Sequence, residues 1–129
     1  MRRYLLDTHV LIWWSQNDPR LPHKWDQLFS HGPDEILFSI VSLWEISIRR
    51  SLSKLKIEGD LGDFSRTLES EHGFRRIGLE VSELCRLEKL PVAHTDLFDQ
   101  LLIAQCIEHG ATAITNHLKW LDYPVRRDF

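Results

Sequence analysis

The sequence has little of what marks disulfide-rich, membrane-spanning or low-complexity proteins. It contains only two cysteines in 129 residues. Cys85 and Cys106 each stand among apolar residues, so we expect two buried, reduced thiols rather than a disulfide framework or a Cys/His metal cluster. No repeat and no linker rich in proline, glycine and serine divides the chain, which predicts a single domain over residues 1–129.

A long apolar run is also missing. Residues 4–14 (YLLDTHVLIWW) follow two arginines and imitate the start of a signal peptide. Asp7 and His9, however, cut this stretch into pieces too short for a signal sequence or a membrane span. We therefore expect an intracellular, cytoplasmic protein that does not associate with a membrane.

Positive charge is not in excess either. Nineteen acidic residues face 16 basic ones, which gives a net charge of −3 at pH 7. A general nucleic-acid-binding protein usually carries a broad basic surface. The charge balance therefore argues against a nucleic-acid partner, unless the acidic residues are concentrated at one place.

Short apolar runs alternate with segments of helical periodicity along the chain. The runs predict strands at residues 3–6, 36–39, 74–77, 112–115 and 123–125, and the periodic segments predict helices at residues 9–15, 21–30, 41–53, 60–71, 81–90, 97–109 and 117–121. Strands of about four residues separated by helices imply crossover connections. We therefore predict an α/β fold, a three-layer α/β/α sandwich around a short-stranded, mainly parallel sheet.

Four carboxylates lie where predicted strands end or predicted helices begin. Asp7 ends the first strand, and Glu45 lies six residues beyond the strand-ending Ser39. Asp96 and Asp99 open the helix at residues 97–109. In parallel α/β sheets such positions meet at the carboxyl edge, where ligands bind. Hard divalent ions such as Mg²⁺ or Mn²⁺ prefer oxygen ligands, so the pattern fits a metal-dependent nuclease.

Each of these acids also has an ordinary structural explanation. Asp7 and Asp96 occupy the position of helix N-caps, and residues 42–45 (SLWE) have the spacing of a capping box. Glu45 and Arg49 have the spacing of a common i, i+4 ion pair. Composition and spacing leave the structural and the metal-binding interpretations open.

Four longer stretches of the chain carry a family resemblance. They are YLLDTHVLIWW with Asp7, SIVSLWEISIRR with Glu45, HTDLFDQLLIAQC with Asp96 and Asp99, and TAITNHLKWLDYPV near the end. With them the chain resembles the PIN-domain ribonucleases, and among these the VapC-type toxins of toxin–antitoxin pairs. The resemblance implies a PIN-like fold and a Mg²⁺- or Mn²⁺-dependent endoribonuclease that hydrolyses structured RNA such as tRNA or rRNA. It also implies that the four acids are the catalytic, metal-binding residues.

The resemblance further implies protein partners. Such toxins bind an antitoxin, here one of the VapB type, through an apolar groove near the first helices, and they form homodimers or toxin–antitoxin hetero-oligomers. Trp13, Trp14 and Trp25 are therefore candidate partner contacts. Neighbouring Trp13 and Trp14 point about 100° apart on a helix and cannot both face one core. Arg49 matches a basic position of the family and is a candidate RNA phosphate contact.

One position departs from the family pattern. Where the family usually has an acid two residues after a strand-ending threonine, Thr115-Asn116-His117 places a histidine. An imidazole suits transition metals better than Mg²⁺, or it acts as an acid or base near neutral pH. A surface His117 behind an Asn116 cap is the ordinary alternative. Thr8 and Asn116 are further accessory candidates, and Thr8 is expected to donate a hydrogen bond to a neighbouring carboxylate.

Two other functions remain open. A phosphoacceptor receiver domain shares the small α/β fold, but it needs an acidic pair at the first strand and a well-placed lysine after the last, and here Asp7 stands alone and Lys119 lies in a poor position. The second is a PIN-like protein that lost catalysis through His117 and retains only RNA or antitoxin binding.

The overall charge can now be reconsidered. Without the four clustered acids, 15 acidic residues face 16 basic ones. The charge balance therefore allows an RNA contact that is modest, metal-dependent and local to the cleft.

Overall fold

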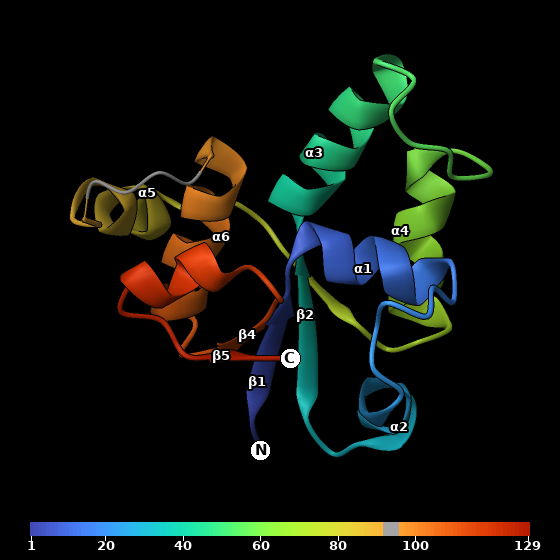
Figure 1. The fold of residues 1–129 in the computed structure, drawn as a ribbon, viewed down its shortest axis with the longest axis horizontal. Coiled ribbons are helices and arrows are strands. Elements are labelled where there is room, and N and C mark those ends of the chain that lie inside the picture. Colours follow the sequence, from blue (N-terminus) through green and yellow to red (C-terminus); the bar gives the residue numbers. More distant parts are fainter. Residues whose placement is uncertain (92–95) are drawn as a thin grey trace.

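The computed structural model describes residues 1–91 and 96–129 and has a five-stranded sheet at its centre (Figure 1). The strands are β1 (Arg3–Leu6), β2 (Glu35–Ser39), β3 (Arg75–Ile77), β4 (Thr112–Ile114) and β5 (Arg127–Asp128). They are arranged in the order β3-β2-β1-β4-β5, and every described pairing is parallel. The predicted parallel α/β fold is confirmed.

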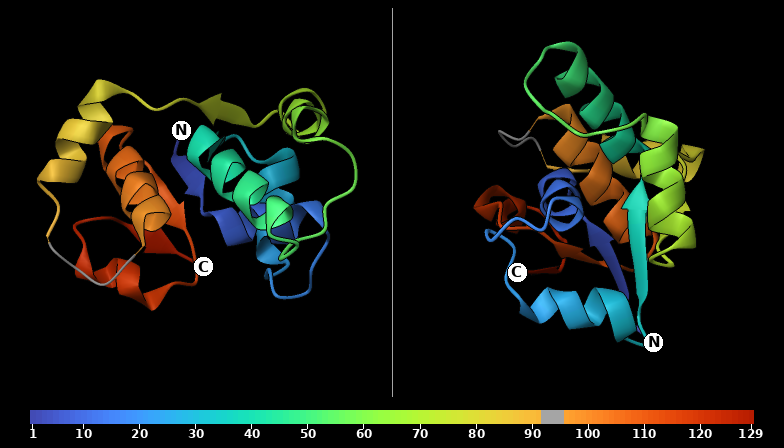
Figure 2. Two further views of the ribbon diagram at one scale, coloured as in Figure 1. Left: turned by 90° about the horizontal axis from the view of Figure 1, so that it is seen from above. Right: turned by 90° about the vertical axis from the view of Figure 1, so that its right-hand side faces the viewer.

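The helices cover both faces of this sheet. They are α1 (Thr8–Ser15), α2 (Lys24–His31), α3 (Ile40–Ser51), α4 (Leu61–Ser70), α5 (Val81–Glu88) and α6 (Leu97–Glu108), followed by a 3₁₀ helix, η1 (Leu118–Asp122). Figure 2 shows α5 and α6 on one side of the strands and α1, α2 and α4 on the other. Among the described segments, none forms a helix with the length and apolarity that a bilayer crossing requires.

The central strand β1 explains why the sheet is buried on both faces. Tyr4 and Leu6 belong to one apolar cluster, and Leu5 between them belongs to the other. Successive side chains of a strand point to opposite faces, so a strand that is apolar at consecutive positions serves two cores. β1 is held by Leu5 opposite Leu37 of β2 and by Leu6 opposite Ile114 of β4. This register places the residue after Leu6 at the carboxyl edge of the sheet.

A chain of buried polar groups joins three elements on the α6 side of the sheet. The Ser39 hydroxyl donates to Gln105 Oε1 at 2.5 Å, and Gln105 Nε2 donates to Glu83 Oε1 at 2.7 Å. All three residues are at most 1% exposed. Ser39 is also the N-cap of α3, with its hydroxyl accepting from the amide of Val41. The network therefore fixes the start of α3 against α6 and α5.

Three sequence predictions need correction. The last strand is β5 rather than residues 123–125, because Tyr123 is buried and Val125 N–H closes a tight turn onto the Tyr123 carbonyl. The second helix begins at Lys24 and not at residue 21, since Leu21 fills the core from an irregular segment. Cys106 is buried as predicted, and burial raises the pKa of its thiol, but Cys85 is exposed on α5. Its neighbour Leu84 is exposed as well, and Leu87 is the residue of this turn that packs against the core.

Candidate active site

The carboxyl edge of the sheet gathers the four predicted acids from three separate segments. Asp7 directly follows β1 and is 1% exposed, and Glu45 is buried in α3. Asp96 is the N-cap of α6, where it accepts from the amide of Asp99 at 2.9 Å. Burial, together with the negative charges of Asp96, Asp7 and Glu45, raises the pKa of Asp99 to about 7, while His117 acts in the opposite direction. The four acids therefore act on one another electrostatically, as expected of a site that holds a cation.

Asp7 is held rigidly by hydrogen bonds to both of its carboxylate oxygens. As the N-cap of α1 it accepts the amide N–H of His9 on Oδ1 at 2.6 Å. The hydroxyl of Thr115, which is buried at the end of β4, donates to Oδ2. A carboxylate offers about four acceptor positions, so two remain for a further ligand. Capping and ligand binding are thus compatible, and the structural explanation does not exclude the functional one.

Two histidines stand beside Asp7, and the sequence predicted a place near the site for only one of them. His117 Nε2 and His9 Nδ1 each lie 3.8 Å from a carboxylate oxygen of Asp7. The two nitrogens are 3.3 Å apart, although the residues are separated by 108 positions in sequence. His117 is therefore not a plain surface side chain behind a cap, and its neighbour Asn116 is exposed. No role for His9 at the site was predicted from the sequence, and its position two residues after Asp7 was the one sequence feature that could have indicated it.

Arg49 links Glu45 to His9. Its Nη2 donates to Glu45 Oε2 at 2.6 Å, and its Nη1 lies 3.3 Å from His9 Nε2. Burial lowers the pKa of His9, and the positive charge of Arg49 lowers it further, while Asp7 and Glu45 act in the opposite direction. His9 is therefore held mainly in its neutral form at pH 7.

The structure excludes one ordinary explanation of these acids and contradicts one prediction. α3 is capped by Ser39, so residues 42–45 do not form a capping box. Thr8 donates its hydroxyl to Ser42 Oγ at 3.0 Å instead of to a carboxylate, and the threonine that fixes Asp7 is Thr115. The Thr8–Ser42 bond instead joins the first turn of α1 to the first turn of α3.

The donor set of this site fits a divalent cation. Carboxylate oxygens from three segments and two imidazole nitrogens lie around one edge of the sheet. Among the described residues, the tightest group of candidate ligand atoms is formed by Asp7, His9 and His117, all within 4.8 Å of one another. Oxygen ligands suit Mg²⁺ and Mn²⁺, and imidazoles suit transition ions.

Comparison with known proteins places this site in a family. A model of the PIN domain matches residues 4–123, which include the four acids and both histidines. The chain belongs to the PIN-domain family. Ribonuclease VapC22 from Mycobacterium tuberculosis (strain ATCC 25618 / H37Rv) is 29% identical to this PIN domain over 116 residues, which are 89% of this chain and 87% of that protein.

Solved structures share the fold of this PIN domain. VapBC2 from Rickettsia felis, bound to a DNA fragment from its promoter, contains a chain that superimposes with a TM-score of 0.72 at 17% identity, covering 98% of this chain and 97% of the other. DNA-bound VapBC from Salmonella typhimurium gives a TM-score of 0.67 at 16% identity, with coverage of 99% and 98%. These similarities confirm the PIN fold.

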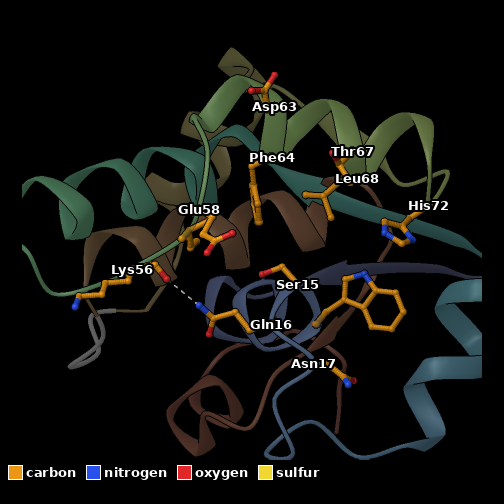
Figure 3. Close-up of a pocket in the computed structure, with 12 residues that line it drawn as sticks. Ser15, Gln16, Asn17, Lys56, Glu58, Asp63, Phe64, Thr67, Leu68 and His72 are labelled. Carbon is orange, nitrogen blue, oxygen red and sulfur yellow. Dashed lines mark hydrogen bonds between the residues drawn. The ribbon is translucent and has the colours of Figure 1, made fainter.

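The tryptophans proposed as partner contacts are mostly internal in this PIN domain. Trp13 and Trp25 are 6% and 4% exposed and belong to one apolar cluster, and the half-buried Trp14 packs against that same cluster. The prediction that Trp13 and Trp14 cannot face one core is therefore wrong, because α1 is buried over a wide face. Trp14 also lines a cavity of about 630 Å³ between the end of α1, α4 and residues 56–58 (Figure 3). Gln16 crosses this cavity to donate to the Lys56 carbonyl at 3.0 Å. None of the four acids lines it.

The raised pKa of Asp99 predicts pH-dependent stability in the absence of divalent cations. A folded-state pKa of about 7, above the ordinary 3.8, means that the folded protein binds this proton more tightly than the unfolded chain. Its stabilising contribution is full below about pH 4 and is lost as the pH rises to 7. In EDTA, the melting temperature of the wild type should fall over this range relative to that of Asp99→Asn. Parallel pH profiles for the two proteins would contradict the assignment.

Proposed function

We propose that this PIN domain is a divalent-metal-dependent endoribonuclease of the VapC type, the toxin of a pair with a VapB-type antitoxin, working in the cytoplasm as a single domain over residues 1–129. The observation that carries the proposal is the gathering of four acids from three segments around the buried Asp7 at the carboxyl edge of the sheet. The similarity to a protein named as a ribonuclease supports the choice of RNA as substrate.

Asp7, Glu45 and Asp96 are proposed to hold Mg²⁺ or Mn²⁺. Such an ion, when bound, supplies positive charge that polarises the scissile phosphate and makes a nearby water more acidic. Thr115 and the His9 amide fix the orientation of Asp7, so this ligand is already in place before substrate arrives. Asp99, in the first turn of α6, is proposed to bind the ion as well or to accept a hydrogen bond from the attacking water. The products are RNA ends carrying a 5′-phosphate and a 3′-hydroxyl.

Arg49 is the proposed contact to a substrate phosphate. Its guanidinium is about one-third exposed and is already held beside the acids by its ion pair with Glu45. A planar guanidinium donates two parallel hydrogen bonds to a phosphate, which fixes the position of the RNA backbone as well as binding it. The ion pair orients Arg49 so that the RNA phosphate would lie next to the four acids.

An antitoxin is proposed to occupy the hollow beside the first helix. The cavity next to Trp14 combines the partly exposed apolar side chains of Ile57 and Phe64 with polar groups, and it lies outside the acidic cluster. A partner segment in this cavity would cover apolar surface that is otherwise open to water. The R. felis and S. typhimurium proteins of the same fold were solved as VapBC complexes, which supports a protein partner for this chain.

An RNA cleavage assay tests the proposed activity. The purified wild type is incubated with tRNA and with rRNA fragments in Mg²⁺, in Mn²⁺ and in EDTA. We expect endonucleolytic products with 5′-phosphate ends under at least one metal and none in EDTA. Binding of RNA or antitoxin without cleavage under either metal would overturn the enzymatic proposal. That result would favour the binding-only alternative associated with His117.

A further inference from the structure

One corner of the site has a different chemistry from the rest. Asp7, His9 and His117 offer one carboxylate and two imidazoles, all within 4.8 Å of one another. The other three acids lie outside this compact group among the described residues. Because imidazole nitrogen is a softer ligand than carboxylate oxygen, this group favours transition-metal ions over Mg²⁺ more than a site made only of carboxylates does.

The spacing of the three side chains matches that of ligands around one ion. His9 Nδ1 and His117 Nε2 are 3.3 Å apart, and each is 3.8 Å from an oxygen of Asp7. Ligands that each lie about 2.1 Å from a tetrahedral ion are about 3.4 Å from one another. Only small side-chain movements are needed to bring all three atoms to bonding distance.

The corner is also held in place by its surroundings. Thr115 donates its hydroxyl to Asp7 and accepts the backbone N–H of His117 at 3.1 Å, so one buried side chain positions two of the three residues. Hydrogen bonds of this kind fix the orientation of metal ligands in known sites. The side chains of His9 and His117 are 34% and 35% exposed, which leaves access for an ion from solvent.

We propose that Asp7, His9 and His117 form a mixed nitrogen and oxygen site that binds a divalent transition-metal ion, such as Mn²⁺ or Zn²⁺, in preference to Mg²⁺. His9 binds through Nδ1, so its remaining proton sits on Nε2. Arg49 Nη1, which now lies 3.3 Å from that Nε2, then gives up this contact and keeps its ion pair with Glu45. Ion binding thereby frees one edge of the guanidinium.

This inference deepens the proposed nuclease site and rests on it for its biological meaning, but its test requires no RNA. Isothermal titration calorimetry measures the affinity of the folded protein for Zn²⁺, Mn²⁺ and Mg²⁺. Absorption of added Co²⁺ reports whether nitrogen ligands surround the ion. For the wild type we expect Zn²⁺ and Mn²⁺ to bind at least about tenfold more tightly than Mg²⁺.

Histidine variants distinguish Zn²⁺ binding at this site from Zn²⁺ binding at other histidines of the protein. His9→Gln and His117→Gln should each weaken Zn²⁺ binding by about tenfold or more. His117→Asp should instead restore a hard ligand and narrow the preference for Zn²⁺ over Mg²⁺. His23→Gln is the matched control, since His23 is 96% exposed and pairs only with Asp26 in α2 among its described contacts, and it should bind Zn²⁺ like the wild type. Thermal melts verify that each variant is folded.

The outcomes are distinguishable. Unchanged Zn²⁺ affinity in folded His9→Gln and His117→Gln, or equal affinity of the wild type for Zn²⁺ and Mg²⁺, would overturn the inference. RNA cleavage in Mg²⁺ alongside either result would leave the nuclease proposal standing. Histidine-dependent Zn²⁺ binding without cleavage under any metal would support the inference while the nuclease proposal fails.

Discussion

Asp7→Asn is expected to reduce RNA cleavage by at least about a thousandfold, which corresponds to about 4 kcal/mol of lost transition-state stabilisation. Asparagine keeps an oxygen for the His9 amide and is as good an N-cap as aspartate, so α1 should remain intact. The substitution removes the negative charge of the most buried of the four acids and the carboxylate oxygen that accepts the hydrogen bond of the Thr115 hydroxyl. The loss should therefore appear in catalysis and in metal affinity rather than in the fold.

Initial cleavage rates in Mg²⁺ and Mn²⁺, with a circular dichroism spectrum of each protein, check this expectation. Asp26→Asn is the matched control, because Asp26 is a partly exposed acid on α2 that pairs with His23, near the amino end of β1 and away from the carboxyl edge of the sheet (Figure 1). It should cleave like the wild type. A folded Asp7→Asn protein that retains more than about a tenth of the activity would contradict the role given to Asp7.

Gln105→Leu is expected to lower the free energy of unfolding by about 2–4 kcal/mol. Leucine matches the volume of the buried glutamine but can neither accept from Ser39 nor donate to Glu83. The Glu83 carboxylate, at 1% exposure, would lose a buried donor, and Ser39 would lose its acceptor. Buried polar groups without partners are among the few causes of losses this large.

Urea unfolding of both proteins measures the change. Gln16→Leu is the matched control, because Gln16 makes one exposed hydrogen bond to the Lys56 carbonyl, and it should alter stability by no more than about 0.5 kcal/mol. If Gln105→Leu is as stable as the wild type, the buried network does not hold α3 and α6 together. We also expect the folded Gln105→Leu protein to cleave RNA more slowly than the wild type, because the start of α3, the helix that carries Glu45, is no longer fixed.

The sequence predicted the alternation of strands and helices well because each signal is local. β1 and β2 are short apolar runs closed by Asp7 and Ser39, and these two residues are N-caps of the following helices in the structure. The error at the C-terminal strand arose because Tyr123 and Val125 look like strand formers, while Pro124 and a tight turn place the strand at β5 instead. Which residues form the last strand depends on their pairing with β4, which is distant in local sequence terms.

The site was only partly predictable, because its remaining contacts are long-range. His9 meets His117 since β1 and β4 are neighbours in the sheet, an adjacency that strand order alone establishes. The same adjacency brings Thr115 to Asp7. Periodicity and capping signals act within a few residues and carry no information on strand order. The role expected of Thr8 was therefore assigned to the wrong threonine.

The Thr8–Ser42 hydrogen bond shows that the first turns of α1 and α3 lie side by side. α6, whose N-cap is Asp96, begins close enough to Asp7 and Glu45 for their charges to raise the pKa of Asp99 in its first turn. Three helices thus direct their amide dipoles, positive at the amino end, toward one small volume. The carboxylates mask this positive potential. A variant with all four replaced by amides would leave a pocket that attracts anions, and such a protein would hold RNA uncut without any cation, which makes it the form in which to capture the complex.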